Sequence, residues 1–187
     1  MRQQRGNDGD SPPPGAWGRL VPGSVEDERP MIPLRIRGLG STRDNKRTVI
    51  LLEDPEQRFR LAFSTDPDEA KRLAREMGRA GCRCNPVYDL IQSFLEAFQA
   101  TITRVVLEDA GYHGLAARVE LRLRASGLGM VLPCYPPDAL ALALRIGAPI
   151  YATASALAQA ESTCGQPFLP SDVDVSRWVD RLNPEDF

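Results

Sequence analysis

The stretch Tyr135-Pro136-Pro137-Asp138-Ala139-Leu140-Ala141-Leu142-Ala143-Leu144-Arg145-Ile146-Gly147-Ala148-Pro149-Ile150 decides how we read the fold. Its two prolines fix the start of a helix, and the residues that follow, 139–144, are apolar on every side. A helix that is apolar all round has to be buried. Gly147 ends this helix and Pro149 prevents its continuation. We therefore predict a core helix here, with a polar start at Asp138.

Upstream of this helix, most of the chain is patterned as strands. Apolar and polar residues alternate, or β-branched residues cluster, and turn-forming residues separate the runs. We predict a first strand over 34–39, a hairpin of 48–54 with 58–63, a second hairpin of 101–108 with 115–123, and a short strand over 129–132.

Two further helices are predicted between the hairpins. The first has Asp66 as its N-cap, Pro67 at its first position and Glu69 in its first turn, and it ends before Gly78. The second begins at 85–86 and places apolar residues at helical spacing, so we expect this stripe to face the core: Leu90, Ile91, Phe94, Leu95 and Phe98. Shorter helices are predicted over 154–160 and 172–182.

These elements predict an α+β fold, in which a mainly antiparallel sheet of hairpins packs against several helices in a single compact domain. A length of 187 residues suits one domain. Residues 1–30 are rich in Gly, Pro and Ser without apolar periodicity, so we predict disorder there. The domain is predicted over 31–160. Residues 161–187 are then a C-terminal extension whose short helix docks on the domain.

Composition excludes several classes of protein. No apolar run approaches the roughly 20 residues that span a bilayer, and the first residues, 1–8, lack the apolar stretch of a secretory signal. We therefore expect a cytoplasmic protein without a membrane partner. Four cysteines, Cys82, Cys84, Cys134 and Cys164, are read as reduced thiols, with a metal or redox role for the first two as the alternative.

The residue inventory leaves carboxylate chemistry as the main catalytic route. The single histidine, His113, has no nucleophile motif near it, and the sequence contains neither a P-loop nor a dinucleotide-binding motif. Acidic side chains that hold divalent cations are a common means of cleaving phosphodiesters. The candidates are Glu53, Asp54, Glu69, Asp89 and Asp138. The structural alternative is that carboxylates in first turns complement the helix dipole.

The segment 137–150 resembles the C-terminal signature of the bifunctional nuclease family, which reads roughly Arg-Pro-Ser-Asp-Ala-Ile-Ala-Leu-Ala-x-Arg-x-Gly-Ala-Pro-Ile. Three earlier stretches follow in the same order as in that family. Residues 49–54 are similar to its opening strand, residues 68–70 to the start of its first helix, and residues 85–90 to its Arg-Pro-x-Thr-His-Asp-Leu segment. The resemblance covers about residues 34–160.

This resemblance implies a compact domain with hydrolase activity on both DNA and RNA. Carried over by position, it implies Glu69, Asp89 and Asp138 as catalytic residues and as ligands of a divalent cation, Mg²⁺ or Mn²⁺. We expect the substrate to be bound by Tyr88, Tyr135 and Arg145.

The sequence also departs from the family pattern at functional positions. Tyr88 stands where the family usually has His, and Tyr135 and Pro137 stand where it has Arg and Ser. These changes remove a candidate general base or metal ligand and a phosphate clamp. A catalytically diverged binding or regulatory module on the same fold is therefore the alternative function, and an oligomerisation domain that forms a homo-oligomer is the third.

Overall fold

The computed structural model describes residues 30–41, 48–78, 86–111 and 114–163. The elements in chain order are β1 (Met31–Ser41), β2 (Thr48–Glu53), β3 (Arg60–Thr65), α1 (Pro67–Met77), α2 (Pro86–Ala97), β4 (Ala100–Asp109), β5 (Leu115–Leu123), β6 (Gly129–Cys134), α3 (Pro136–Ile146), β7 (Ile150–Thr153) and α4 (Ala154–Thr163). The predicted disorder before residue 30 and the predicted helix over 172–182 lie outside the described residues, as do His113, Cys82, Cys84 and Cys164.

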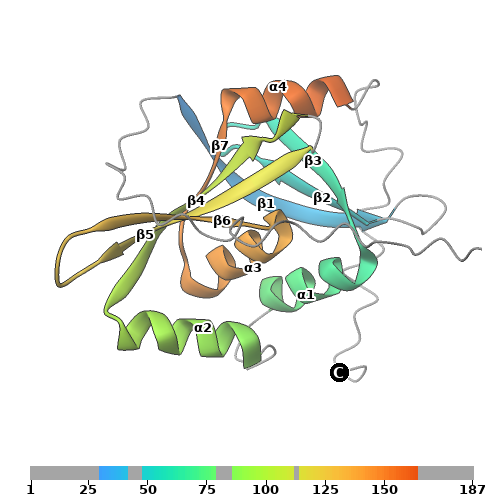
Figure 1. Ribbon diagram of the computed structural model, residues 1–187. Coiled ribbons are helices and arrows are strands. Elements are labelled where there is room, and N and C mark those ends of the chain that lie inside the picture. Colours follow the sequence, from blue (N-terminus) through green and yellow to red (C-terminus); the bar gives the residue numbers. More distant parts are fainter. Residues whose placement is uncertain (1–29, 42–47, 79–85, 112–113, 164–187) are drawn as a thin grey trace, which may run out of the picture.

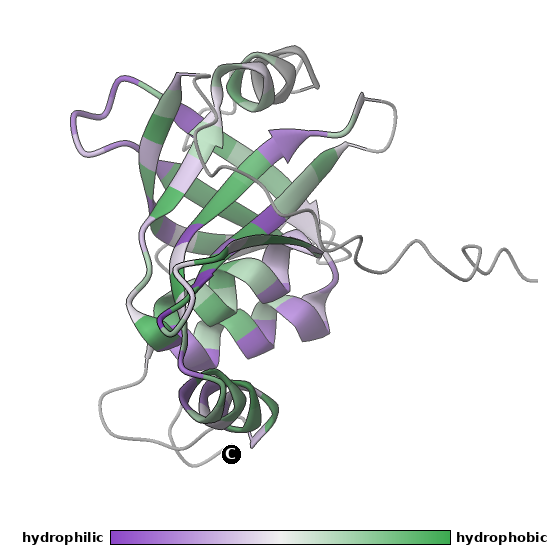
Figure 2. Ribbon diagram, turned by 60° about the vertical axis from the view of Figure 1, so that its left-hand side comes forward, coloured by the Kyte–Doolittle hydropathy of each residue, from purple (hydrophilic) through white to green (hydrophobic). Residues whose placement is uncertain are grey.

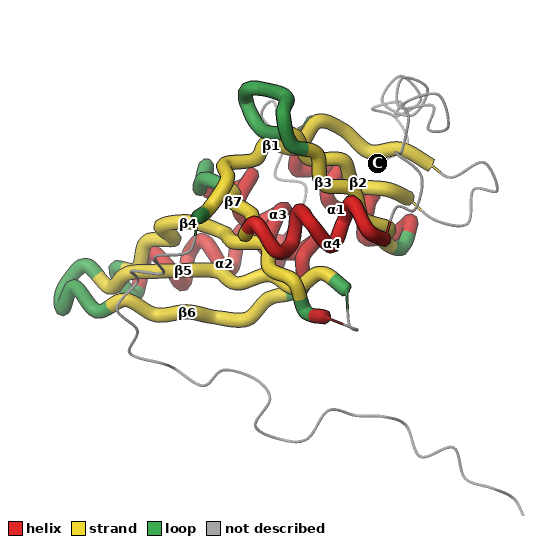
Figure 3. Tube along the Cα trace, turned by 90° about the horizontal axis from the view of Figure 1, so that it is seen from above, coloured by secondary structure: helices red, strands yellow, loops and turns green. Residues whose placement is uncertain are grey.

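The strands form one sheet in the order β3-β2-β1-β7-β4-β5-β6, which confirms the predicted α+β class and single domain. Two antiparallel three-stranded units, β1–β2–β3 and β4–β5–β6, lie at either side of β7. Strand β7 pairs antiparallel with β1 and parallel with β4, as can be followed in Figure 3. The sheet is therefore mainly antiparallel, with one parallel pairing at its centre.

Strand β7 was not predicted from the sequence, although it joins the two halves of the sheet. Ile150 is paired with Leu34 of β1 on one side and with Val105 of β4 on the other. The ladder continues one residue earlier, because the amide of Val105 donates to the carbonyl of Pro149 at 2.9 Å. A strand of four residues directly after a proline gives too short a pattern to be recognised from sequence.

The helices divide between the two sides of the sheet. Figure 1 shows α1, α2 and α3 below the sheet and α4 above it. Helix α3 packs against α1, β4 and β5. Its residues 139–143 are buried, as the apolar pattern over 139–144 predicted, whereas Leu144 is 36% exposed. In the described part of the chain, no helix is long and apolar enough to cross a bilayer.

Helix starts and ends follow the predicted signals. Asp66 caps α1 by accepting a hydrogen bond from the amide of Asp68 at 2.9 Å. Helix α3 ends at Gly147, which has a φ of 76° and donates its amide to the carbonyl of Ala143 at 2.9 Å. The left-handed conformation at this position explains why glycine stands there.

The prediction that the apolar stripe of α2 faces the core was wrong for three of its five residues. Leu90, Phe94 and Phe98 are 55%, 52% and 70% exposed. Helix α2 turns Tyr88 inward instead, and its Ile91 and Leu95 are partly buried against the core. Helical periodicity identifies which residues share a side, but it does not say which neighbouring element covers that side.

Replacement of the glycine at the end of α3 tests the role of its backbone conformation. We expect Gly147→Ala to lower the free energy of unfolding by about 1 kcal/mol, because alanine is strained at a positive φ. Gly78→Ala is the matched control, since Gly78 ends α1 at a φ of −81° and a Cβ there meets only ordinary van der Waals contact. Urea unfolding of both variants should separate them; equal stabilities would contradict this account.

Candidate functional site

Two carboxylates in the first turns of neighbouring helices are each held by a tyrosine from another segment. The Tyr88 hydroxyl of α2 donates to Oδ1 of Asp138 in α3 at 2.9 Å. The Tyr135 hydroxyl donates to Oε2 of Glu69 in α1 at 3.0 Å, and the same oxygen accepts from the Thr65 hydroxyl at 2.5 Å. Four of the residues predicted from sequence therefore form two carboxylate–phenol pairs where α1, α2 and α3 meet.

Tyr135 connects these two pairs. It stands directly before α3, at the N-cap position, but its side chain makes no capping hydrogen bond and reaches Glu69 instead. Burial, the hydrogen bond to Glu69 and the charges of Glu69 and Asp138 raise the pKa of the Tyr135 phenol, against a smaller opposing effect of Thr65. Because Tyr135 stands three residues before Asp138 at the start of α3 and hydrogen-bonds Glu69 of α1, the two carboxylates lie at neighbouring helix starts.

The charge of Asp138 also raises the pKa of two other side chains, Tyr88 and Cys134. Burial, followed by the charge of Asp138 and the hydrogen bond to it, raises the pKa of Tyr88 far above its ordinary value. Tyr88 is therefore protonated near neutral pH and donates to Asp138. Burial and the Asp138 charge likewise raise the pKa of the Cys134 thiol to about 11, so this thiol is a poor nucleophile near neutral pH.

The site is open to solvent on the Tyr135 side. Tyr135 is 51% exposed, and the side chain of Glu69 is 22% exposed. The Arg72 guanidinium, with its side chain 48% exposed, lies 4.0 Å from Oε1 of Glu69, and its charge also lowers the pKa of Tyr88 slightly. An anionic ligand that approached Tyr135 would thus meet one arginine beside the two carboxylates.

Asp89 and Arg145 were predicted as site residues, and the structure places them in a different interaction. Arg145 of α3 has a fully buried side chain that forms ion pairs with Glu76 of α1, at 3.3 Å, and with Asp89 of α2. Glu76 is also fully buried, whereas the side chain of Asp89 is 37% exposed. The three charges tie the three helices together, and the buried position of Arg145 does not offer it to a substrate.

A comparison with protein-family models matches residues 50–164 to the bifunctional nuclease domain. This match covers more than half of the chain and contains α1, α2 and α3 with both carboxylate–phenol pairs. The chain belongs to the bifunctional nuclease domain family. Comparison with curated protein sequences gives no match.

In this family member, the sequence reasoning missed Glu76, which is the buried partner of Arg145. A signal was present, because Glu76 follows Leu73 by three residues and therefore lies on the buried side of α1 with Ala70 and Ala74. A carboxylate on the apolar face of a helix needs a buried cation. The arginine of the family signature, Arg145, provides it.

The two remaining acidic candidates have structural roles in the bifunctional nuclease domain. Glu53 pairs with Arg60 at 3.0 Å and with Arg37 at 3.7 Å, across the β1–β2–β3 unit. Asp54 closes the β2–β3 turn by accepting the amide of Phe59 at 2.7 Å. Burial acts to raise the pKa of Asp54, but the backbone amides of the turn outweigh it, so the pKa lies below its usual value.

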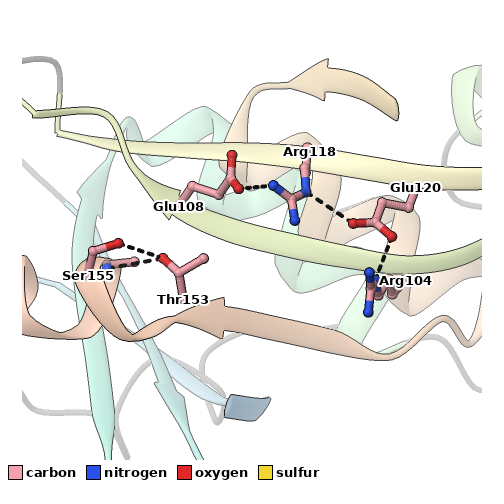
Figure 4. Close-up of polar contacts among 7 residues, drawn as sticks. Arg104, Glu108, Arg118, Glu120, Thr153 and Ser155 are labelled. Carbon is pink, nitrogen blue, oxygen red and sulfur yellow. Dashed lines mark hydrogen bonds and ion pairs between the residues drawn. The ribbon is translucent and has the colours of Figure 1, made fainter. Parts of the chain in front are cut away.

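A second polar cluster lies on β4 and β5, and Figure 4 shows it in close-up. Glu120 is 2% exposed and accepts hydrogen bonds from Arg104 at 2.5 Å and from Arg118 at 3.1 Å, while Arg118 also binds Glu108. Both carboxylates here are neutralised by arginines of the same two strands. We therefore read the cluster as part of the sheet rather than as a site.

A divalent cation at the Glu69–Asp138 site depends on few protein ligands. The described residues contain no group of three or more His, Cys, Asp and Glu side chains that could hold a metal. Mg²⁺ is commonly bound through one or two carboxylates together with substrate phosphates. Glu69 and Asp138 fit that pattern in number and donor type, so the cation predicted from sequence stays a prediction.

Removing the buried cation tests the interaction among the three helices. We expect Arg145→Met to lower the free energy of unfolding by about 3–5 kcal/mol, because it leaves Glu76 charged and buried without its partner. Adding Glu76→Gln to the same chain should recover part of the loss. Lys71→Met changes an exposed residue of α1 whose ion-pair partner, Asp68, is also exposed, so it should alter stability by less than about 1 kcal/mol. Equal losses for Lys71→Met and Arg145→Met in urea unfolding would contradict a stabilising role of the buried ion pairs.

Alkylation of Cys134 tests whether the charge of Asp138 raises the pKa of the Cys134 thiol. Because a pKa of about 11 leaves little thiolate, iodoacetamide should modify Cys134 slowly at pH 8, as followed by peptide mass spectrometry. Asp138→Asn removes a charge that raises this pKa, so the thiolate fraction and the rate should rise severalfold. Asp68→Asn, a change at an exposed position of α1, should leave the rate as it is. An unchanged alkylation rate in Asp138→Asn would refute an effect of Asp138 on the Cys134 thiol.

Proposed function

We propose that the domain hydrolyses phosphodiester bonds of DNA or RNA at the site formed by Glu69 and Asp138. The observation that carries this proposal is that the half-exposed Tyr135, at the start of α3 that bears Asp138, hydrogen-bonds Glu69 of α1, with Arg72 4.0 Å from Glu69. Family membership supports a nuclease-like function. We assign that function to the first turns of α1 and α3, where the two carboxylate–phenol pairs lie.

The chain's own residues can supply the elements of hydrolysis. Asp138 is fixed by Tyr88 at one oxygen and can accept a proton from a water molecule. As the water oxygen forms a bond to phosphorus, the bond from phosphorus to the ester oxygen breaks, and the leaving oxygen takes a proton from solvent. Tyr135 remains protonated and, together with Arg72, can hold the phosphate.

A divalent cation fits this proposal. Bound to carboxylate oxygens of Glu69 and Asp138 and to the substrate phosphate, it would stabilise the charge that develops on the phosphate oxygens. Asp89 is not included in the proposed catalytic set, because its carboxylate is bound to Arg145. We assign Asp89 to the placement of α2, and through α2 to the placement of Tyr88.

One observation favours a second function, a binding or regulatory module that does not turn over its ligand. The side chains that occupy the positions of the family's His and Arg are Tyr88 and Tyr135, and each uses its hydroxyl on a carboxylate. If these hydrogen bonds persist with a ligand present, Asp138 and Glu69 lose acceptor capacity for water or a cation. Such a module would bind nucleic acid without cleavage.

Conservative amide variants distinguish the two functions. With Mg²⁺ or Mn²⁺ and labelled DNA or RNA, we expect Asp138→Asn to lower the single-turnover rate constant of cleavage by about 10²–10⁴-fold, the usual contribution of a general base. We expect Glu69→Gln to lower it by a similar factor. The measurement is cleavage of a labelled oligonucleotide under single-turnover conditions.

Asp68→Asn is the matched control, since Asp68 precedes Glu69 in the same turn, is 81% exposed at its side chain and pairs with Lys71. This variant should cleave at the parent rate. Full cleavage by Asp138→Asn would refute the proposed site. Absence of cleavage in the parent chain, combined with retained oligonucleotide binding, would establish the binding module instead.

A further inference from the structure

Helix α2 carries an apolar face that the described part of the chain leaves uncovered. Val87, Leu90, Phe94 and Phe98 are 60%, 55%, 52% and 70% exposed. They follow one another at intervals of three or four residues. Phe98 comes directly after the helix and donates its amide to the carbonyl of Phe94 at 2.9 Å, so all four residues lie on one side. The rings of Phe94 and Phe98 stack with their centroids 6.3 Å apart. In Figure 2, hydrophobic colour accordingly runs along one side of α2 at the bottom of the view.

The charges of α2 argue against nucleic acid as the occupant of this face. The helix has no lysine or arginine, and its two charged residues, Asp89 and Glu96, are carboxylates. They stand seven residues apart and lie on the other side of the helix from Phe94. Binding of a phosphate backbone depends on cations, so a protein surface is the better match for this face.

The size of the face is that of the centre of a self-association interface. Four side chains that are each more than half exposed present on the order of 400 Å² of apolar surface, the size of the largest apolar patch on a typical monomer, which is often functional. A standard protein interface covers about 800 Å² on each partner and has an apolar centre with a polar rim. The face of α2 could supply that centre.

We propose that two copies of the chain associate through this face with their α2 helices antiparallel. An antiparallel pair centred between Leu90 and Phe94 places Phe94 against Leu90 of the other copy and Phe98 against Val87 of the other copy. Every contact then joins an aromatic ring to a smaller aliphatic side chain, which allows close packing. A parallel pair would instead set ring against ring.

The antiparallel pair also follows the symmetry that homodimers usually adopt. A two-fold axis brings the same patch of both copies together, so the patch has to be complementary to itself. The order Val87, Leu90, Phe94, Phe98 meets this condition because its small residues and its large residues occupy opposite ends. This interface does not depend on whether the domain cleaves phosphodiesters.

The first experiment measures the mass of the full chain in solution. Analytical ultracentrifugation over a range of concentrations should show a monomer–dimer equilibrium. We expect Phe94→Asp to raise the dimer dissociation constant more than about tenfold, since it buries two carboxylates in the interface. Ala158→Asp adds the same charge at an exposed position of α4, on the other side of the sheet (Figure 1), and should leave the equilibrium unchanged.

The second experiment tests the orientation of the helices by disulfide cross-linking. A mixture of Val87→Cys and Phe98→Cys chains should form a cross-link between positions 87 and 98, identified by peptide mass spectrometry, with the parent chain as the blank for native cysteines. Neither variant alone should cross-link at its new position, because identical residues are far apart in an antiparallel pair. Cross-linking of either variant to itself would contradict the antiparallel arrangement.

Three further results would overturn the proposal. A parent chain that stays monomeric up to high micromolar concentration is the first, and a dimer unaffected by Phe94→Asp is the second. The third is a monomer that binds a labelled single-stranded oligonucleotide and loses this binding in Phe94→Asp, which would assign the face to nucleic acid. Urea unfolding of Phe94→Asp serves as the check that the variant is folded.

Discussion

The burial of the Arg145 guanidinium is the constraint on which the arrangement of α1, α2 and α3 depends. A cation without solvent contact has to be matched by carboxylates, and these come from Glu76 of α1 and Asp89 of α2. The residue next to Asp89 is Tyr88, whose hydroxyl binds Asp138. Tyr88 and Asp89 of α2 thus contact the start and the end of α3, respectively. The ion pair between Asp89 and Arg145 therefore helps to position the helix that carries Tyr88.

The candidate site follows from this arrangement. Helix α3 is mostly apolar and carries Asp138 in its first turn. Helix α1 packs against it and carries Glu69 in its own first turn. The Tyr135 hydroxyl, from the start of α3, hydrogen-bonds Glu69 of α1. Each carboxylate thus accepts a hydrogen bond from a tyrosine. Arg72 of α1 lies 4.0 Å from Glu69 and is exposed.

Local patterns predicted most of the fold, and the parts they missed depend on tertiary contacts. The apolar run of α3 implied burial by itself, and the Asp66-Pro67 start of α1 was recognisable because capping is a local interaction. Strand β7 and the exposed side of α2 could not be predicted, since β7 depends on two distant strands, and no described element covers that side of α2. For the candidate site, the sequence grouped Asp89 and Arg145 with Glu69, Asp138, Tyr88 and Tyr135. The structure places the first two in an ion pair and the other four in two carboxylate–phenol pairs, because spacing along a chain does not show which opposite charges meet inside.

The position of β7 also constrains how this protein can be made on the ribosome. Strand β1 pairs with β7, which lies roughly a hundred residues later in the chain, and β4 pairs with β7 on its other edge. During synthesis, both three-stranded units therefore expose a free edge until Ile150 to Thr153 has emerged, and free edges can pair with other chains. Four residues near the end of the domain thus close the sheet, and a nascent chain that stalls before them presents two open strand edges to its surroundings.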